Sequence, residues 1–375
     1  MPRRSYLAEH PIFTFLTHHH QGKPKLEEVC RPTVRSIKGN INLMGLAMLV
    51  LPVLLGLFYG ASDINCSIVH GNTTDHHSLL DFKGAIRADP RGALRSWNEN
   101  IHYYMWSGIK CITMHPEHVT VLNLANMSLT GQITPSLGNL TFLQELTLSN
   151  NLFSGQLPPL NCLIRLEILY LQNNLLQGNI PNALTNCSKL LGLDLSSNML
   201  VGLIPGNIGS LYNLMGIDLS TNSLTGNIPP TFGNNTYLEE LRLTHNQLKG
   251  SIPEELGKLP DMTKDRAVFL GQNRLSGRVP ATLFNLSKLI ILDLSTNKLR
   301  GTLPYDIGNL SVALQWLVLG ANNLSGTVPP SIGALKNLTV LDLGGNNFVG
   351  PIPYSVGNLP KLWKLDLSNN HFDSW

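Results

Sequence analysis

The chain has 375 residues and a formal net charge of +3, with 43% hydrophobic and 14% charged residues. Residues 1–62 contain seven Lys or Arg against three Asp or Glu, so 20 basic and 21 acidic side chains remain in the rest of the chain. Because that remainder is nearly neutral and shows no basic stripe along the sequence, we do not expect it to bind nucleic acid.

An apolar run, Leu43–Ala61, follows a leader at residues 1–40 that we expect to lack stable structure. Residues 41–62 are predicted to be either a secretory signal peptide or a signal anchor. A proline and three glycines inside the run, with Gly60 and Ser62 spaced for cleavage, favour a signal peptide. Basic residues before the run stay in the cytoplasm, so either alternative sends the downstream chain into the secretory pathway.

Residues 63–118 are predicted to form an N-terminal cap. Within this segment Leu79, Phe82 and Ile86 recur at helical spacing, which predicts a helix with one apolar face. A helix of this kind covers the first of a series of stacked repeats, whose open end would otherwise leave apolar surface in water.

From residue 119 to residue 375 the chain repeats one frame, Leu-x-Leu-x-x-Asn-x-Leu-x-Gly-x-Ile-Pro, at intervals of 23 to 27 residues. A repeat of this length and pattern predicts a leucine-rich-repeat solenoid of about eleven turns. Met127 stands at the asparagine position of a degenerate first copy. The asparagines of the later copies are Asn151, Asn174, Asn198, Asn222, Asn246, Asn273, Asn297, Asn322, Asn346 and Asn370.

The frame has a physical meaning at each position. The two leucines of Leu-x-Leu point inward from a short strand and the residues between them point outward, so stacked copies form a parallel sheet. The chain then turns sharply, and the asparagine offers a donor and an acceptor to the buried backbone groups of that turn. The Gly-x-Ile-Pro tail, with a flexible glycine and a proline that has no N–H, is suited to a second, lateral face.

With its Leu-x-Gly-x-Ile-Pro tail, the repeat region resembles the plant-type extracellular leucine-rich repeats of receptor-like kinases and receptor-like proteins. Residues 63–118 resemble the N-terminal cap of the same family. The resemblance implies an α/β solenoid: a right-handed superhelix with one parallel strand per repeat, a plant-type second sheet and a helical N-terminal cap. Residues 119–375 carry no C-terminal cap, so the chain looks like a truncated copy of a longer receptor.

The cap departs from its family pattern, Cys-x-Trp-x-Gly-Val-x-Cys, at the first cysteine, which is Tyr104 here. Cys111 therefore lacks its usual partner, and we expect a looser cap unless Cys66 replaces that partner. Cys162 and Cys187 lie in neighbouring repeats, and we interpret both as packing residues in preference to a disulfide.

Ten Asn-x-Ser/Thr sequons support a secretory address: Asn65, Asn72, Asn126, Asn139, Asn186, Asn234, Asn285, Asn309, Asn323 and Asn337. The repeat template creates some of these sequons by itself, but we expect several to be glycosylated. Five of them, Asn139, Asn186, Asn234, Asn285 and Asn309, recur 12 or 13 residues before the ladder asparagine. That spacing places them on the convex side and leaves the concave face open.

The sequence offers no catalytic site. The glycine-rich loop, strand lysine and catalytic aspartates of a protein kinase are missing from these 375 residues, although a parent receptor of this family carries a Ser/Thr kinase domain. His115-Pro-Glu-His118 places two histidines near a carboxylate, but the proline prevents a helical metalloprotease arrangement, so we expect a solvated loop. We predict no cofactor and no metal site.

Function is therefore expected on the outward positions of the strands. The commonest sequence at these strands, Leu-Asp-Leu-Ser, belongs to the repeat template of the family. Large or chemically distinctive residues that replace it are the candidate partner-binding residues: Tyr170, Gln172, Arg242, Thr244, His245, Phe269, Gln272, Trp316 and Val318. The alternative is structural: Trp316 packs along a neighbouring strand and Arg242 pairs with Glu240.

These observations predict the ligand-binding domain of a plant receptor-like kinase or receptor-like protein, which recognises a peptide or protein on its concave face and docks a co-receptor kinase. Two alternatives remain open: a secreted inhibitor that resembles the polygalacturonase-inhibiting proteins, and a truncated product that does not signal. The expected location is the plasma membrane, on its extracellular side, or the cell wall. Attachment to the membrane would come from the signal anchor or from a span outside this sequence.

Overall fold

A computed structural model describes residues 72–375, apart from 113–114, 161, 260–265, 311 and 374–375. The described residues belong to one compact unit, Val69–Trp375. The predicted leader and the apolar run lie outside them, as do Cys66 and Asn65. In the described part of the chain, no helix combines the length and the apolar character needed to cross a membrane.

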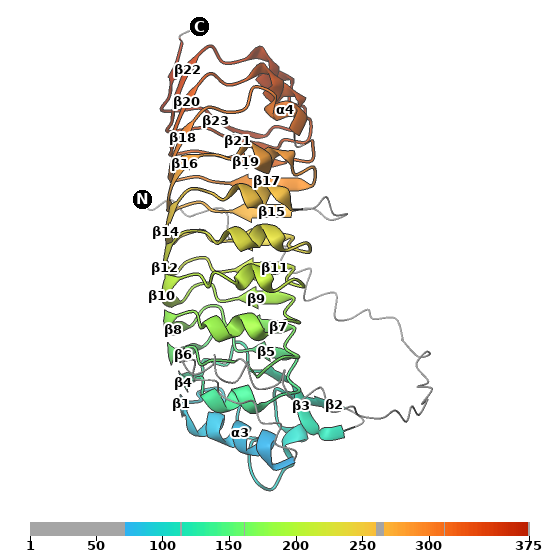
Figure 1. Cartoon of the computed structure of the whole chain (residues 1–375). Coiled ribbons are helices and arrows are strands. Elements are labelled where there is room, and N and C mark those ends of the chain that lie inside the picture. Colours follow the sequence, from blue (N-terminus) through green and yellow to red (C-terminus); the bar gives the residue numbers. More distant parts are fainter. Residues whose placement is uncertain (1–71, 113–114, 161, 260–265, 311, 374–375) are drawn as a thin grey trace, which may run out of the picture. The chain divides into compact units, whose positions relative to one another are not determined.

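Each repeat contributes a short strand to a first sheet of twelve strands, which follow one another in chain order (Figure 1). β2 and β3 pair antiparallel, and from β3 onward each strand pairs parallel with the next, so the prediction of one parallel strand per repeat is confirmed. The strands are β2 (Ile109–Ile112), β3 (His115–Asn123), β5 (Glu145–Thr147), β7 (Ile168–Tyr170), β9 (Gly192–Asp194), β11 (Gly216–Asp218), β13 (Glu240–Arg242), β15 (Arg266–Phe269), β17 (Leu289–Asp293), β19 (Trp316–Val318), β21 (Val340–Asp342) and β23 (Lys364–Asp366).

The predicted second sheet also forms, from β1 of the cap and the strand that follows the ladder position of each repeat. Its first pair is antiparallel and its later pairs are parallel. The strands are β1 (Ile86–Ala88), β4 (Thr130–Gln132), β6 (Leu152–Gln156), β8 (Leu175–Asn179), β10 (Met199–Leu203), β12 (Ser223–Gly226), β14 (Gln247–Gly250), β16 (Arg274–Arg278), β18 (Lys298–Gly301), β20 (Asn323–Gly326), β22 (Asn347–Gly350) and β24 (His371–Phe372).

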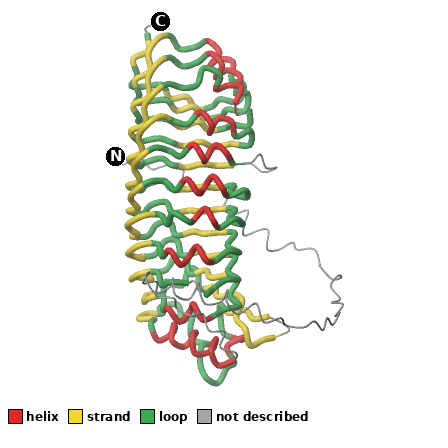
Figure 2. Tube along the Cα trace, viewed as in Figure 1, coloured by secondary structure: helices red, strands yellow, loops and turns green. Residues whose placement is uncertain are grey.

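In most repeats a short helix lies between the strand of the second sheet and the next strand of the first sheet. The helices of successive repeats stack beside one another (Figure 2). Gly209 shows how closely they approach, because a Cβ atom there would lie 2.0 Å from the Thr231 carbonyl oxygen. The helices of the repeats are η3 (Pro135–Asn139), η4 (Asn182–Asn186), η5 (Ile208–Ser210), η6 (Pro230–Asn234), η7 (Glu254–Lys258), η8 (Ala281–Asn285), α4 (Ile307–Leu310), η9 (Pro330–Ala334) and η10 (Tyr354–Asn358).

Between these layers one continuous core contains the frame leucines, of which Leu146, Leu148 and Leu219 are fully buried. The ladder asparagine satisfies the turn as predicted. Asn222 accepts a hydrogen bond from the Leu200 backbone N–H at 3.0 Å and donates to the Leu195 carbonyl at 3.0 Å. Because each asparagine bonds the preceding repeat as well as its own, the ladder links successive turns.

The residue immediately before each ladder asparagine adopts a left-handed conformation, with φ of 53° at Thr221 and 55° at Ala321. Only glycine and asparagine adopt this region at low cost, yet several repeats use other residues there. His245 and Gln272, two of the candidate binding residues, occupy this turn position and have φ of 60° and 53°. Their backbone geometry is thus set by the repeat.

The predicted cap helix is α3 (Asn72–Gly84), and it buries Leu79 and Phe82 completely. Ile86 does not lie on that helix, so this part of the prediction is wrong. The helix ends at Gly84, and Ile86 begins β1, which pairs with β4 of the second sheet. The cap core is aromatic: Trp97 and Trp106, which follow α3 and flank η2 (Tyr103–Met105), stack with centroids 5.1 Å apart.

One further expectation for the cap is wrong. The segment that starts at His115 is not a solvated loop, because it forms the beginning of β3 and pairs with β2. His118 stacks on Phe142 with ring centroids 3.9 Å apart, and its Nδ1 lies 3.7 Å from the Asp75 carboxylate. Asp75 also accepts a hydrogen bond from the Val119 backbone N–H, so the acid ties the cap helix to the first repeat.

The bonding state of the cysteines agrees with the prediction for Cys187 but not for Cys162. Cys111 is free, so Cys66 does not replace its missing partner. Cys187 is free and fully buried, as predicted for a packing residue, and burial raises the pKa of its thiol to about 12. Cys162 is disulfide-bonded, which corrects its interpretation as a packing residue; its partner lies outside the described residues.

Candidate partner-binding surface

The outward side chains of the first sheet form two rows, because parallel register places equivalent residues beside each other. From β5 to β23 the second row contains Thr147, Tyr170, Asp194, Asp218, Arg242, Phe269, Asp293, Val318, Asp342 and Asp366. The first row lies beside it and contains Glu145, Ile168, Gly192, Gly216, Glu240, Ala267, Ile291, Trp316, Val340 and Lys364.

Carboxylates dominate the rows between β9 and β13. Asp194 and Asp218 stand on adjacent strands, and each accepts hydrogen bonds from the serine two residues later. Tyr170 occupies the space above Gly192, where a Cβ atom would lie 2.8 Å from the phenol oxygen. The exposed fraction of Asp194, on the same strand as Gly192, is 5%.

We call Asp194, Asp218 and Glu240 the acidic group, and burial changes the protonation of its carboxyls. Desolvation and the neighbouring Asp218 charge raise the pKa of Asp194 to about 7, although the Ser196 hydrogen bonds and Arg242 act in the opposite direction. Desolvation also raises the pKa of Asp218 and of Glu240. Asp194 therefore gains its charge close to neutral pH, and a cation placed over these three carboxyls would lower the pKa of each.

Arg242 joins the acidic part of the face to an apolar part. Its guanidinium forms an ion pair with Glu240 on the same strand, as the structural alternative anticipated. The same guanidinium also lies over the Phe269 ring on the neighbouring strand, with Cζ 4.2 Å from the centroid. Because the guanidinium contacts both an aromatic face and a carboxylate, its position is fixed. Arg242 therefore presents a positive charge at a defined place on the face.

Beyond Arg242 the face becomes apolar. Ala267, Phe269 and Ile291 form a cluster separate from the main core, and Trp316 packs against it. We call these four residues the apolar patch; Val318 and Val340 adjoin it in register. Phe269 is buried and Trp316 is half-buried, so Trp316 packs along the neighbouring strands as the structural alternative anticipated.

Asp293 is an unusual neighbour for the apolar patch. Its register places it between Phe269 and Val318 in the second row, and its exposed fraction is 1%. One carboxylate oxygen accepts from the backbone and the hydroxyl of Ser295, whereas Oδ2 has no hydrogen-bond partner among the described residues. Desolvation raises the pKa of this carboxyl, since burial penalises the charged form.

The structure brings together only some of the predicted binding residues. Arg242, Phe269 and Trp316 lie on successive or nearly successive strands, but Tyr170 is three strands away from Arg242. Gln172, Thr244 and Gln272 are half-buried and His245 is exposed, all in the turns after their strands.

Several residues of this face were missed or dismissed from sequence: Ala267, Ile291, Val340, Asp194, Asp218 and Asp293. The aliphatic residues resemble ordinary strand residues, and the aspartates resemble the family background. A comparison of each aspartate with its neighbours in adjacent repeats would have shown that Asp194 and Asp218 are consecutive.

The described sequon asparagines lie away from these rows. Asn139, Asn186, Asn234 and Asn285 are each the last residue of a short helix and are exposed. Asn126 is exposed in a turn, Asn323 is exposed on β20 of the second sheet, and Asn337 donates to the Val312 carbonyl. The side chains of Asn72 and Asn309 lie outside the description.

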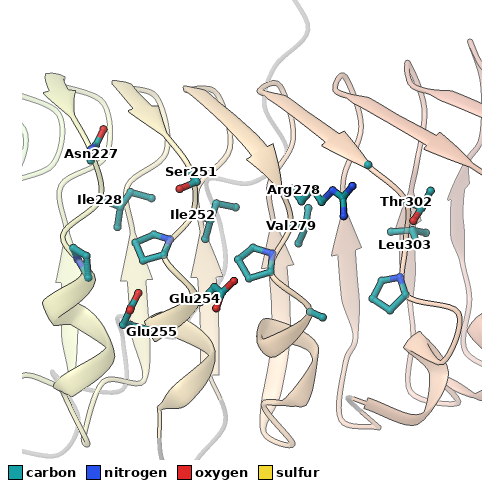
Figure 3. A pocket seen from close by; sticks show the side chains of 16 residues that line it. Asn227, Ile228, Ser251, Ile252, Glu254, Glu255, Arg278, Val279, Thr302 and Leu303 are labelled. Carbon is teal, nitrogen blue, oxygen red and sulfur yellow. The ribbon is translucent and has the colours of Figure 1, made fainter.

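A second feature lies on the lateral side, where the second sheet meets the short helices. An open depression of about 790 Å³ spans four repeats, from Asn227 to Pro304 (Figure 3). In each of the four repeats, the aliphatic residue of the Gly-x-Ile-Pro segment and a proline after it line the depression. Among the described residues, no group of three or more His, Cys, Asp or Glu is placed to hold a metal ion.

Comparison with known families agrees with this architecture. Residues 72–112 match the leucine rich repeat N-terminal domain, and residues 312–372 match a leucine rich repeat family. Single leucine rich repeats match at 142–162, 165–187, 189–211, 213–235, 237–259 and 288–310.

Curated relatives place these repeats in one group of proteins. A receptor-like protein kinase of Arabidopsis thaliana is 38% identical over 113 residues, which are 30% of this chain and 11% of that protein. The LRR receptor-like serine/threonine-protein kinase EFR, also from Arabidopsis thaliana, is 41% identical over 23% of this chain and 8% of its own length. The chain is a plant-type leucine-rich-repeat protein. It matches only a small part of the length of these receptor kinases.

Solved structures similar to this leucine-rich-repeat protein include plant receptor ectodomains. The plant peptide hormone receptor RGFR1 in complex with RGF2 has a TM-score of 0.61 and 40% identity, covering 65% of this chain and 38% of that one. The Arabidopsis receptor kinase HAESA, in complex with the peptide hormone IDA and the co-receptor SERK1, has a TM-score of 0.63 and 30% identity, covering 80% and 54%. A plant ice-binding protein has a TM-score of 0.68 and 28% identity, covering 80% and 96%.

Proposed function

We propose that this leucine-rich-repeat protein is an extracellular binding domain that recognises an extended peptide or peptide segment along the outward face of its first sheet. The observation that carries the proposal is the arrangement of that face, where an acidic group, a fixed arginine and an apolar patch follow one another across adjacent strands. Similarity to ectodomains solved with peptide hormones supports the same ligand class.

The dimensions of the face suit a peptide. Neighbouring strands lie ~4.8 Å apart, so the eight strands from β7 to β21 span roughly 34 Å. An extended chain rises about 3.3 Å per residue, so this distance corresponds to about ten residues. A peptide of this length touches the acidic group and the apolar patch at the same time.

The chemistry of the face predicts the composition of that peptide. A lysine or arginine is expected over Asp194 and Asp218, because a cation stabilises carboxylates that burial has made costly to ionise. An aromatic or aliphatic residue is expected over the apolar patch, since buried aromatic contacts carry much of the energy of such interfaces.

The test is selection of random peptides of about ten residues on the full chain, followed by affinity measurements on synthetic copies of the enriched peptides. Trp316→Ala is expected to weaken binding about tenfold or more, because truncating an aromatic anchor costs over 1 kcal/mol. Tyr305→Ala is the matched control, since Tyr305 is 85% exposed and lies outside both strand rows.

Equal affinity of Trp316→Ala and the unsubstituted chain for every selected peptide would contradict the proposal. So would enrichment of peptides that lack both a basic and an apolar residue. A co-receptor kinase as second partner is part of the same proposal, and its support is the HAESA complex with SERK1.

A further inference from the structure

The second sheet contains a concentration of positive charge that no single repeat reveals. Five exposed basic side chains stand on three consecutive strands, and we call them the basic patch: Lys249 on β14, Arg274 and Arg278 on β16, and Lys298 and Arg300 on β18. The linear sequence shows no basic stripe because each strand contributes only one or two of these residues, roughly 25 positions apart. Stacking of the repeats creates the stripe that was not expected.

Register makes the charges direct neighbours. Lys249 pairs with Arg274 across β14 and β16, and Arg278 pairs with Arg300 across β16 and β18. Like charges directly opposite each other on neighbouring strands are destabilising. Two such pairs in one patch indicate a surface that an anion would stabilise.

Acidic side chains of the protein do little to neutralise the patch. Neither ion pair found in the described part of the chain involves any of its five residues. Glu254 and Glu255 line the depression beside the patch, but they lie on the helical side in Figure 3. Arg278 instead extends across to the neighbouring strand β18 on the side of Thr302, and its side chain lies over Gly301.

The strands on either side limit the patch. β12 presents Ser223 and Thr225, and β20 presents Asn323 and Ser325. The positive surface is therefore three strands wide, and it opens at Arg278 into the lateral depression.

The depression adds a second kind of contact. Its floor repeats an aliphatic residue followed by proline in successive tails, for example Ile252-Pro253 and Val279-Pro280. A sugar ring has an apolar C–H face and polar edges, so it can lie on such a step while its charged edge faces the basic side chains. Sites for single-stranded nucleic acid combine positive charge with aromatic side chains on which the bases stack, and no aromatic residue is among those that line the depression.

We propose that the basic patch and the adjoining depression bind a linear acidic polysaccharide with a carboxylate on each sugar, a polyuronate. The polymer crosses β14, β16 and β18 with its carboxylates on the lysines and arginines, and its rings rest on the aliphatic-proline steps. This site lies on the second sheet and is independent of the peptide surface on the first.

The experiment measures binding of the full chain to polygalacturonate at several salt concentrations, with uncharged dextran and single-stranded DNA as comparison polymers. The triple variant Lys249→Gln, Arg274→Gln, Lys298→Gln is expected to bind about tenfold more weakly, since each exposed charge pair contributes a modest amount. Weaker dependence of the affinity on salt is expected to accompany that loss, because fewer counterions are released.

The matched control removes the same charge elsewhere: Lys189→Gln, Lys258→Gln and Lys288→Gln, all exposed outside the second sheet. It is expected to bind polygalacturonate within about twofold of the unsubstituted chain. An equal loss in both triple variants would overturn the proposal, because net charge and not the patch would then be responsible.

Two other results would also overturn it: binding of dextran as tight as that of polygalacturonate, or tighter binding of DNA that depends on the same three residues. Asn323→Gln is measured in parallel, because a glycan on Asn323 would border Arg300. Peptides selected on the first sheet are expected to bind the patch variant unchanged, so failure of this proposal and failure of the proposed function are distinguishable.

Discussion

The buried carboxyl of Asp194 allows a quantitative test of the candidate surface through the pH dependence of stability. The proposed substitution is Asp194→Asn, which keeps the shape of the side chain and an acceptor for the Ser196 hydrogen bonds. The substitution removes the ability to become charged, in a site that is 5% exposed, and replaces one carboxylate oxygen by an NH2 group. Its effect is therefore expected to depend on pH.

The sign follows from the direction of the pKa shift. Burial and Asp218 raise the pKa of Asp194 from its ordinary value of 3.8 to about 7 in the folded chain. Between about pH 4 and pH 7 the unfolded chain has lost this proton and the folded chain retains it, so the free energy of unfolding falls as pH rises. Above pH 7 both states are ionised and this contribution stays constant.

One unit of pKa corresponds to about 1.4 kcal/mol, and about two units of the shift lie between pH 5 and the folded value. The unsubstituted chain should therefore lose about 3 kcal/mol of stability from this group between pH 5 and pH 8. Asp194→Asn should lose none of that amount. Asp218, Glu240 and Asp293 shift in the same direction, so some decline is expected to remain in the variant.

The assay is urea denaturation of both proteins at pH 5 and pH 8, followed by circular dichroism. Asp366→Asn serves as the control, because Asp366 makes the same hydrogen bonds to Ser368 but is only half-buried on the last strand. The reasoning fails if Asp194→Asn and the unsubstituted chain lose equal stability between the two pH values, or if the variant loses more.

Three further predictions concern the scaffold, and each is measured as a change in the free energy of unfolding. Asn222→Ala should cost about 3 kcal/mol, because it leaves the Leu200 N–H and other buried backbone groups without a partner. Trp97→Ala should cost about 3–5 kcal/mol by emptying the fully buried cap core, whereas Trp363→Ala, at a site 73% exposed, should cost less than about 1 kcal/mol. Ala321→Asn should add about 0.5–1 kcal/mol at φ of 55°, and Ala321→Val should instead destabilise; a reversed order of these two variants would contradict the strain argument.

Most of the fold was predictable because the residues of a single repeat are enough to predict its strand and its turn. Leu146 and Leu148 alternate with outward residues, and this alternation predicts a strand with one buried face. The role of Asn222 followed from the donor and acceptor that a sharp turn requires, and its hydrogen bonds confirm it. Both inferences need only the residues of one repeat and the knowledge that it is copied.

Predictions failed where pairing with another segment of the chain decided the local structure. Helical spacing assigned Ile86 to α3, but the residue pairs with Gly131 on β4. His115-Pro-Glu-His118 was expected to be a loop, but it forms the start of β3, which pairs antiparallel with β2. Cys162 gave no local sign of its disulfide.

The candidate surface was predicted in outline but not in detail. Large side chains such as Phe269 and Trp316 stood out against the template, and the structure places them in one cluster. Asp194 and Asp218 were dismissed because they match the template, although burial makes them chemically distinctive. Burial depends on the neighbours in adjacent repeats, so inspection of one repeat cannot reveal it.

The amino-acid sequence by itself determined that this protein is a solenoid, since the spacing of leucine, asparagine, glycine and proline dictates one strand and one turn per repeat. Only the tertiary structure decided which outward residues share a surface. Side chains about 25 positions apart become neighbours ~4.8 Å apart when the strands stack. That stacking places Arg242 over Phe269, gathers the acidic group on β9, β11 and β13, and assembles the basic patch on β14, β16 and β18.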